Sequence, residues 1–332
     1  MRLPFVALIW LSVLGLLASG AGAAEVDAKS SPELRAIAFL SIEVPKWSRE
    51  NACFSCHNNG DAVRALAGAA AAGLLKDQRP VADSLTFLSQ PDKWDANGPE
   101  GPFKDKKLAR LQFAAAQAEA FAAGWLTDRE SLNRAAEQLL ELQSADGSWP
   151  TDAEGSIGSP VTYGPALATV LAVRTLQSVD RMRHAAAIAK GRSWLRTREP
   201  RSVLAASATL WGLVGEDSQA ANEQGTRSKR LLRQGEAEHG GWGPFVNSPP
   251  EVFDTAVVAL ALASLPDQKE WQPYLRRARK YLIAQQETDG GWPATTRPPG
   301  VDSYSQRIST SAWALQALLV TREIELTPAQ RN

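Results

Sequence analysis

The sequence predicts an all-α protein made of about six helical hairpins, with its helices arranged as an inner and an outer ring. Three observations support this prediction. A short Gln-to-Trp segment recurs three times, tryptophans recur about every 50 residues, and wholly apolar helical stretches alternate with amphipathic ones. A period near 50 over the roughly 300 residues that follow the N-terminal segment gives six units. No stretch shows the period-2 alternation of a strand.

Residues 1–24 are expected to be a signal peptide rather than part of the fold. Arg2 supplies a basic start, residues 5–17 form an apolar run, and residues 18–24 are small, as a cleavage site requires. The run is too short to favour a membrane span, although an uncleaved anchor is the alternative. We therefore expect residues 25–332 to form a single exported domain, most naturally periplasmic, with no transmembrane segment after cleavage.

The composition excludes some classes of function. Lys plus Arg number 36 and Asp plus Glu number 36, so the net charge is zero. A nucleic-acid-binding protein would carry a basic face, so we expect no nucleic-acid partner. Two cysteines are too few for a disulfide scaffold.

The repeated segment is clearest at three places. The copies begin at Gln143, Gln234 and Gln286 and end at Trp149, Trp242 and Trp292. Aligned from Gln234, the middle copy is two residues longer and has His239 where the others have aspartate. Further tryptophans at about the same period mark the remaining units, namely Trp47, Trp94 and Trp194.

Two kinds of helix follow one another along the chain. Residues 254–265 are apolar on every side, as a helix buried all round must be. Residues 271–282 place Trp271, Leu275, Ala278 and Leu282 on one face and Arg276, Arg277, Arg279 and Lys280 on the others. The same alternation recurs at 160–178 and 181–196, and a buried stretch recurs at 304–321. Two helix classes imply a buried inner ring and a half-exposed outer ring.

Q-x-x-D-G-x-W followed by a buried helix resembles the repeat of squalene–hopene cyclases, oxidosqualene cyclases and prenyltransferase β-subunits. The resemblance covers essentially the whole chain after residue 24. It implies an α/α toroid, in which the hairpins close into a barrel with a central cavity. It also implies framework roles for Gln143, Trp149, Gln286 and Trp292: the Gln caps helix ends, Asp-Gly makes the turn, and the Trp packs between hairpins.

The resemblance does not extend to cyclase chemistry. The cyclases protonate an alkene with an Asp in an Asp-x-Asp-Asp-Thr-Ala motif, and the corresponding stretch here is Glu251-Val252-Phe253-Asp254-Thr255-Ala256. Phe253 occupies the position of the protonating Asp, and a phenyl ring cannot donate a proton. Glu251 and Asp254 are expected to cap the helix. The zinc site of the prenyltransferases is unsupported, because neither cysteine lies near that region.

Cys53-Phe54-Ser55-Cys56-His57 has the C-x-x-C-H spacing of a c-type haem attachment site. The two thiols would form thioethers with the haem vinyl groups, and His57 would be the proximal iron ligand. We therefore expect one covalent haem c. A disulfide or dithiol pair and a chance match are the alternatives.

The residues after the motif read Asn58-Asn59-Gly60-Asp61, so the segment is similar to a haem-bearing, exported branch of the repeat superfamily. We expect the haem at a rim loop, near the mouth of the cavity. Asp61 is interpreted as a helix cap. Arg64 is interpreted either as a partner of a haem propionate or as a surface residue.

Few side chains are available as a second axial ligand. His239 is the candidate distal ligand, because it lies in a turn that is expected at the rim. Met182 and His184 are expected to face outward. A lysine or an open coordination position remains an alternative.

Residues at the starts of the buried helices are expected to line the cavity mouth. They are Tyr163, Phe253, Asp254, Tyr304 and Gln306. Their aromatic rings would suit an apolar ligand such as an isoprenoid or a fatty chain. The alternative is that they only fill the barrel.

Three hypotheses for the function follow. The first is a haem oxidoreductase that acts on a hydrophobic substrate. The second is an electron-transfer or haem-sensor protein with the toroid as scaffold and a periplasmic electron-transfer partner. The third is a haem-independent ligand-binding or cyclase-like toroid. No catalytic acid, base or nucleophile is identified, and class II cyclase activity is disfavoured.

Overall fold

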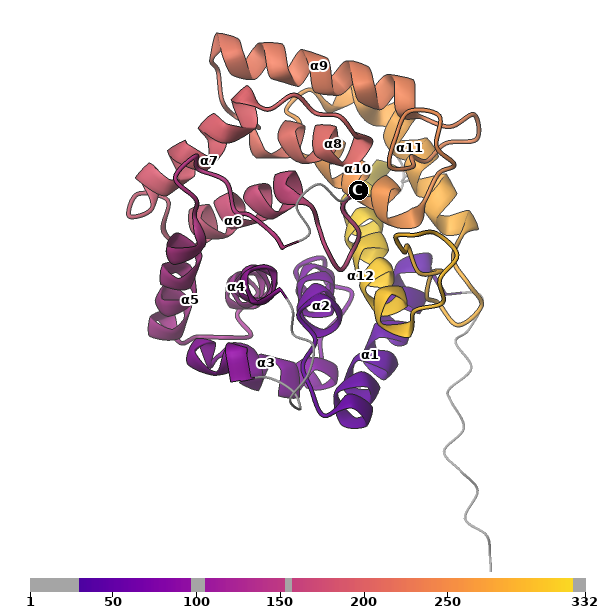
Figure 1. Cartoon of the computed structure of the whole chain (residues 1–332). Coiled ribbons are helices and arrows are strands. Elements are labelled where there is room, and N and C mark those ends of the chain that lie inside the picture. The colour runs from indigo at the N-terminus through magenta and orange to yellow at the C-terminus, as the bar shows by residue number, and fades with distance from the viewer. Residues whose placement is uncertain (1–29, 97–104, 153–156, 325–332) are drawn as a thin grey trace, which may run out of the picture.

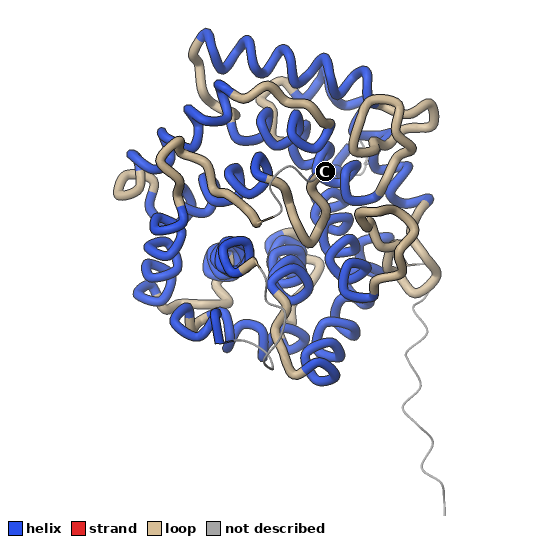
Figure 2. Tube along the Cα trace, viewed as in Figure 1, coloured by secondary structure: helices blue, strands red, loops and turns tan. Residues whose placement is uncertain are grey.

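The computed structural model describes residues 30–96, 105–152 and 157–324. The expected signal peptide lies outside these residues. Across the described parts the chain is helical, with no strand and only two isolated bridges, Glu236–Trp242 and Trp242–Glu251. Figure 2 shows this helix-and-loop construction. The predicted all-α class is confirmed.

The described helices form two concentric rings (Figure 1). The inner ring consists of α2 (Asp61–Ala71), α4 (Lys106–Ala122), α6 (Pro165–Asp180), α8 (Val203–Gly212), α10 (Val252–Ala263) and α12 (Tyr304–Thr321). The outer ring consists of α1 (Pro32–Asn51), α3 (Ala82–Leu88), α5 (Arg129–Leu142), α7 (Ala185–Thr197), α9 (Gln219–Gly235) and α11 (Gln268–Ala284). Short helical turns complete the chain: η1 (Cys56–Gly60), η2 (Arg79–Val81), η3 (Pro91–Ala96) and η4 (Arg322–Ile324).

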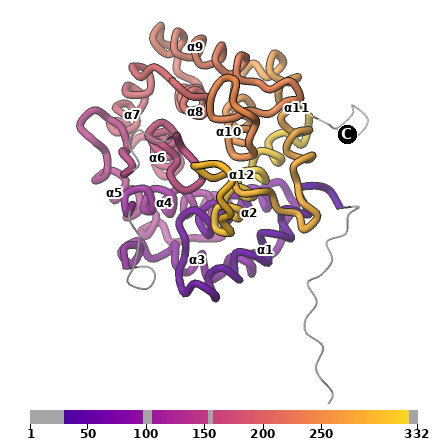
Figure 3. Tube along the Cα trace, turned by 45° about the vertical axis from the view of Figure 1, so that its right-hand side comes forward, coloured from indigo at the N-terminus to yellow at the C-terminus, as the bar shows by residue number. Residues whose placement is uncertain are grey.

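The inner ring is closed. Each inner helix packs against the inner helices on both sides of it, and α12 packs against α2. The oblique view of Figure 3 shows α9 and α11 outside this ring. The predicted α/α toroid is therefore confirmed. Within the described residues no helix combines the length and the apolar character needed to cross a membrane.

The two rings differ in composition, as the sequence predicts. In α10 every side chain from Val252 to Leu262 is buried. In α11 the buried face consists of Trp271, Leu275, Ala278 and Leu282, and it also includes Arg279. The prediction that Arg279 faces solvent is therefore wrong. Its guanidinium binds the buried Glu33 carboxylate of α1 at 2.6 Å, so a buried ion pair joins the last outer helix to the first.

The repeated tryptophans hold each hairpin together. The indole N–H groups of Trp149, Trp242 and Trp292 donate to carbonyls ten residues earlier, at 2.7 Å in all three copies. Their backbone N–H groups donate to hydroxyls of the next inner helix, at Thr169, Thr255 and Ser311. All three side chains are fully buried. The predicted packing of these tryptophans between hairpins is confirmed.

The repeated glutamines join one unit to the next. Nε2 of Gln143 donates to Gly147 O in its own turn and to Ala187 O at the start of α7. Nε2 of Gln286 makes the same two bonds, to Gly290 O and to Pro32 O at the start of α1, each at 2.9 Å. The framework role predicted for these glutamines is confirmed, and Gln286 closes the ring.

The middle copy of the repeat contains no insertion. Its turn has the same backbone hydrogen bonds as the other two, since Ala237 N–H donates to Gly241 O just as Ser144 donates to Ser148 and Glu287 to Gly291. Glu236, six residues before Trp242, therefore takes the place of the glutamine. Its carboxylate binds Arg277 of α11 at 2.6 Å. The sequence alignment that began this copy at Gln234 is wrong by two residues.

The other three tryptophans are not in equivalent turns. Trp47 lies in α1, Trp94 in η3 and Trp194 in α7. Trp194 contacts the turn at residues 143–149 from the outer ring, because its indole N–H donates to Asp146 at 3.0 Å. The period of about 50 is real, but these tryptophans mark outer elements rather than turns.

Removing the Gln286 amide is expected to destabilise the toroid. Gln286→Ala deletes two bonds to backbone carbonyls, so we expect the free energy of unfolding to fall by about 1–3 kcal/mol. Urea unfolding followed by circular dichroism measures this. The neighbouring Gln285 is exposed, so Gln285→Ala is the matched control. Equal losses in the two variants would contradict the ring-closing role of Gln286.

Candidate functional site

The segment Cys53–Gly60 is fixed by side-chain hydrogen bonds. It leaves α1 at Ala52, whose φ of 50° is left-handed. Ser55 caps η1 by accepting from Asn58 N–H. The buried Asn59 accepts from Ser55 N–H at 2.9 Å and donates to the hydroxyls of Ser48 and Ser84 at 2.8 and 2.9 Å. The segment is therefore held to both α1 and α3 through one amide.

The side chains of the C-x-x-C-H motif have defined surroundings. Cys53 and Cys56 are half-buried and not joined in a disulfide. Burial raises the pKa of the Cys56 thiol. Phe54 stacks on Phe87 of α3, with ring centroids 4.8 Å apart and planes 14° from parallel. This stacking anchors the loop between the two thiols.

The His57 imidazole is hydrogen-bonded to α12 through its Nδ1. Its Nδ1 lies 3.1 Å from Ser309 Oγ, and that hydroxyl donates its own proton to Asn58 Oδ1 at 3.2 Å. With the Ser309 proton assigned to Asn58, Ser309 accepts from Nδ1–H, and this assignment leaves the Nε2 lone pair available. Burial lowers the pKa of His57 to about 4, so the imidazole is neutral at neutral pH. A neutral imidazole with a fixed Nδ1–H is the form that binds metals.

A buried carboxyl lies at the start of α2, a few residues beyond His57. Asp61 is fully buried and accepts hydrogen bonds from the Tyr163 hydroxyl and, at 3.0 Å, from the Trp313 indole N–H. Arg64 lies 3.3 Å from Asp61, and its guanidinium stacks over the Trp313 ring at 4.9 Å. Burial raises the pKa of Asp61 to about 7. The prediction that Asp61 caps the helix is therefore wrong: it is the first residue of α2, no side chain caps that helix, and its carboxyl is the centre of a buried polar cluster.

Aromatic rings complete this cluster into a layer across the barrel. Tyr163 and Phe253 both pack edge-on against Trp313, with centroids 5.6 and 5.4 Å away. We call Asp61, Tyr163, Phe253 and Trp313 the lumen layer. Its members come from α2, the loop before α6, α10 and α12, and all are buried. The layer therefore fills the barrel on the side of the inner-helix N-termini.

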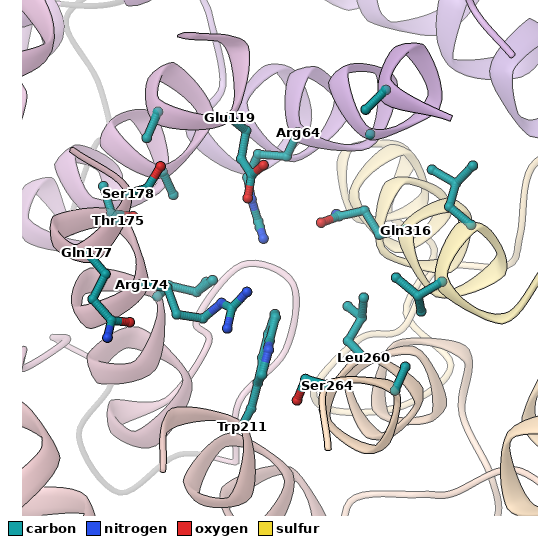
Figure 4. A pocket seen from close by; sticks show the side chains of 18 of the residues that line it. Arg64, Glu119, Arg174, Thr175, Gln177, Ser178, Trp211, Leu260, Ser264 and Gln316 are labelled. Atoms are coloured by element: carbon teal, nitrogen blue, oxygen red, sulfur yellow. The ribbon is translucent and has the colours of Figure 1, made fainter. Parts of the chain in front are cut away.

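A cavity of about 840 Å³ occupies the other half of the barrel. Apart from Arg64, its lining belongs to the C-terminal parts of the inner helices and the residues just after them. Arg64, Glu119, Arg174, Trp211 and Gln316 project into it (Figure 4). Its remaining wall is mostly small or apolar: Gly68, Ala71, Ala72, Ala115, Ala118, Leu171, Thr175, Gln177, Ser178, Leu260, Ala263, Ser264, Leu319 and Val320.

The cavity and the Cys53–His57 segment lie at opposite ends of the inner ring. The segment precedes the N-terminus of α2, whereas the cavity is lined by C-terminal parts of the same helices. The sequence placed the haem loop near the cavity mouth; the structure puts the lumen layer between the two. Arg64 bridges them, because it binds Asp61 of the layer and lines the cavity.

The residues expected at the cavity mouth lie elsewhere. Tyr163 and Phe253 belong to the lumen layer. Asp254 binds Arg297 at 2.6 Å, and Glu251 binds the same guanidinium, so these carboxylates hold an arginine instead of capping α10. Tyr304 and Gln306 are in the first turn of α12, where Tyr304 packs on Trp47 with centroids 5.9 Å apart. None of the five lines the 840 Å³ cavity.

The candidate axial ligands are widely distributed. His239 is exposed in the turn that packs against Arg277 of α11, and no hydrogen bond or ring contact of the described residues joins it to His57. Met182 is 83% exposed, as expected. The outward position expected for His184 is wrong, because it is buried at the start of α7 and its Nε2 has no partner among the described residues.

Sequence reasoning missed the residues that organise both ends of the barrel. Ser309, Trp313 and Arg174 lie in stretches that read only as buried helix. A signal was present for Asp61 and Arg64, since opposite charges three residues apart on an otherwise apolar helix indicate a buried pair. Among the described residues no group of three or more His, Cys, Asp or Glu side chains is arranged to hold a bare metal ion.

Asp61 is expected to make stability depend on pH. A carboxyl in the unfolded chain titrates near 4, whereas the pKa of Asp61 in the fold is about 7. Between these values the folded protein holds the extra proton, so its free energy of unfolding falls as the pH rises. Asp61→Asn cannot titrate. Between pH 5 and 8 the variant should therefore gain about 3 kcal/mol relative to the wild type in urea unfolding.

The matched control for this experiment is Asp217→Asn, which changes an exposed carboxyl on the outer surface. It should leave the pH dependence of unfolding unchanged. If Asp61→Asn and the wild type gave parallel stability curves over this range, Asp61 would not be a buried titrating group.

Comparison with known proteins identifies the fold. Neither a protein-family model nor a curated protein matches the sequence. Among solved structures, the chain is similar to the type II terpene cyclase MstE from Scytonema without ligand, at 15% identity and a TM-score of 0.56, over 88% of this chain and 97% of that one. Two variants of MstE in complex with geranylgeranyl dihydroxybenzoate match at 14% and 16% identity, with TM-scores of 0.55 and 0.53, over 88% of this chain and 99% of theirs. At these identities the likeness establishes a terpene-cyclase-like α/α toroid.

Proposed function

We propose that this chain is an exported c-type haem protein whose toroid encloses a site for a hydrophobic, isoprenoid-like ligand, and that it acts as an oxidoreductase. Cys53 and Cys56 would hold one haem c covalently, and His57 would be its proximal ligand. The observation that carries the proposal is the C-x-x-C-H motif on a fixed loop, with His57 Nδ1–H bound to Ser309 and Nε2 free.

The surroundings of the motif fit such a group. Both thiols are free, as thioether formation requires. Trp47 and Tyr304 pack together on the adjacent ends of α1 and α12, so aromatic surface is available next to the loop. A porphyrin supplies four of the iron ligands, so the protein needs to add only one or two. A bound haem would supply one-electron chemistry and, with an open sixth position, binding of a small molecule at iron.

The fold supports the ligand part of the proposal. The cavity volume of about 840 Å³ is within the usual range for small-molecule sites, and much of its wall is alanine and leucine. A protein of the same fold, MstE, is in complex with a geranylgeranyl compound. Cyclisation by alkene protonation is not proposed, because Phe253 stands where that reaction needs a carboxylic acid.

The main alternative is an electron-transfer or haem-sensor protein with a periplasmic electron partner. One observation favours it: the lumen layer separates the motif from the cavity. The oxidoreductase proposal is supported instead by a continuous path along α12. Ser309 binds His57, and Trp313, one turn further, belongs to the layer and stacks with the cavity residue Arg64. A haem-independent ligand-binding toroid is the second alternative.

Absorption spectroscopy tests the haem proposal. The full chain, expressed with a cytochrome c maturation system, should be recovered from the periplasm with a haem spectrum that survives acid–acetone extraction. Cys53→Ala/Cys56→Ala should lose that covalent haem. Ser144→Ala/Ser148→Ala, in a distant turn, is the control double variant and should keep it. A colourless wild-type protein would overturn the proposal.

Carbon monoxide distinguishes the two haem functions. Rapid binding to the ferrous protein would indicate an open position and support the oxidoreductase. A low-spin spectrum that carbon monoxide does not change would indicate a second protein ligand and support electron transfer. In that case His239→Ala should be measured next, and an unchanged spectrum would exclude His239 as the distal ligand.

A further inference from the structure

We propose that the lumen cavity binds an amphiphile by its carboxylate, with Arg174 and Arg64 as the head-group site and the small-residue wall of α2 and α4 beside its tail. This inference deepens the ligand part of the proposed function, because it names the chemical class of the ligand. It does not depend on haem attachment.

Arg64 provides a buried donor that lacks a partner. Its side chain is 4% exposed and projects from α2 into the cavity (Figure 4). One face of the guanidinium lies over Trp313, and Nη1 lies 3.3 Å from Asp61. Its Nε is buried and makes no hydrogen bond with the described residues. A buried N–H without an acceptor is costly, so a ligand oxygen there would be stabilised.

Arg174 provides a second cation in the same space. Its guanidinium stacks on Trp211 at 4.6 Å but makes no hydrogen bond or ion pair with the described residues. The side chain is accessible from the lumen, yet the surrounding barrel wall lowers its pKa by burial. An arginine that faces a lumen and makes no direct ion pair is well suited to accept an oxyanion in a paired geometry.

The charge balance favours a head group with a single negative charge. Asp61 already accompanies Arg64, and Glu119 projects into the cavity near both arginines without forming an ion pair with them. Two guanidiniums therefore face two carboxyls. Because burial raises the pKa of Asp61 to about 7, this carboxyl is only partly ionised at neutral pH, and the site keeps a fraction of a positive charge. A carboxylate adds one charge to this balance, whereas a phosphate monoester adds nearly two. Repulsion by Glu119 should be weaker for the carboxylate.

The rest of the wall accommodates an apolar chain. Gly68 and Ala71 of α2, with Ala72 just after it, line the cavity together with Ala115 and Ala118 of α4 and with Leu319 of α12. These side chains offer neither hydrogen-bond donors nor charges. A ligand with its head group at the arginines would bury its hydrocarbon tail against them, which is favourable in proportion to the apolar area removed from water.

Isothermal titration with twelve-carbon probes tests this assignment. The full-length wild type should bind dodecanoate at least about tenfold more tightly than dodecanol or dodecyl phosphate. Arg174→Leu should weaken dodecanoate binding by about tenfold or more, since it removes a charge-assisted hydrogen bond, and leave dodecanol binding unchanged. Arg174→Lys should retain part of the affinity. Arg227→Leu, at an exposed arginine of α9, is the matched control and should bind like the wild type.

Several results would overturn the proposal. They are equal dodecanoate affinity in the wild type and Arg174→Leu, dodecanol binding as tight as dodecanoate, or tighter binding of dodecyl phosphate. The Cys53→Ala/Cys56→Ala variant separates this site from the haem. If it binds dodecanoate but the wild type carries no haem, only the haem proposal fails. If the holoprotein is red but no probe binds, only the ligand assignment fails.

Discussion

The structure depends on the closure of the inner ring. An inner helix such as α10 is apolar on all sides, so it is stable only when neighbours cover every face. An open row of such helices would expose an apolar face at each end. Packing of α12 against α2 covers both faces. The contacts that cross this junction are correspondingly specific. In the outer ring, the Gln286 amide bond to Pro32 and the buried ion pair between Arg279 and Glu33 join the end of the chain to α1.

Closing the ring creates a lumen, and the two halves of this lumen are lined by different kinds of side chain. At the N-terminal ends of the inner helices, Tyr163, Phe253 and Trp313 fill the space around the Asp61 carboxyl. At the C-terminal ends, α2 and α4 carry glycine and alanine, which leave space in the lumen. A cavity therefore remains there, and it is open to the side chains of Arg64 and Arg174. Filling one half and leaving the other hollow defines the direction from which a ligand can enter.

The sequence predicted the ring better than it predicted the lumen. The helix classes follow from the periodicity of the sequence, and the roles of Gln286 and Trp292 follow from the resemblance to the cyclase repeat. The contents of the lumen come from six helices that are far apart in the sequence, and nothing local indicates that Trp313 meets Asp61 or that Arg174 faces Arg64. The residues expected at the cavity mouth lie at the starts of inner helices, and the structure shows that this side of the lumen is filled. The Cys53–His57 motif could be recognised in the sequence because all its residues are adjacent in the chain.

The lumen layer is the element that the two proposed sites share. His57 contacts it through Ser309 and α12, and the cavity contacts it through Arg64. Asp61 lies between them with a pKa of about 7, so its charge is sensitive to nearby charges at neutral pH. A second positive charge near either face would favour its ionised form, and a bound carboxylate near Arg64 would favour its neutral form. Any function that couples the motif to the cavity must act through this layer, and a function that uses only one of them requires the layer only as a wall.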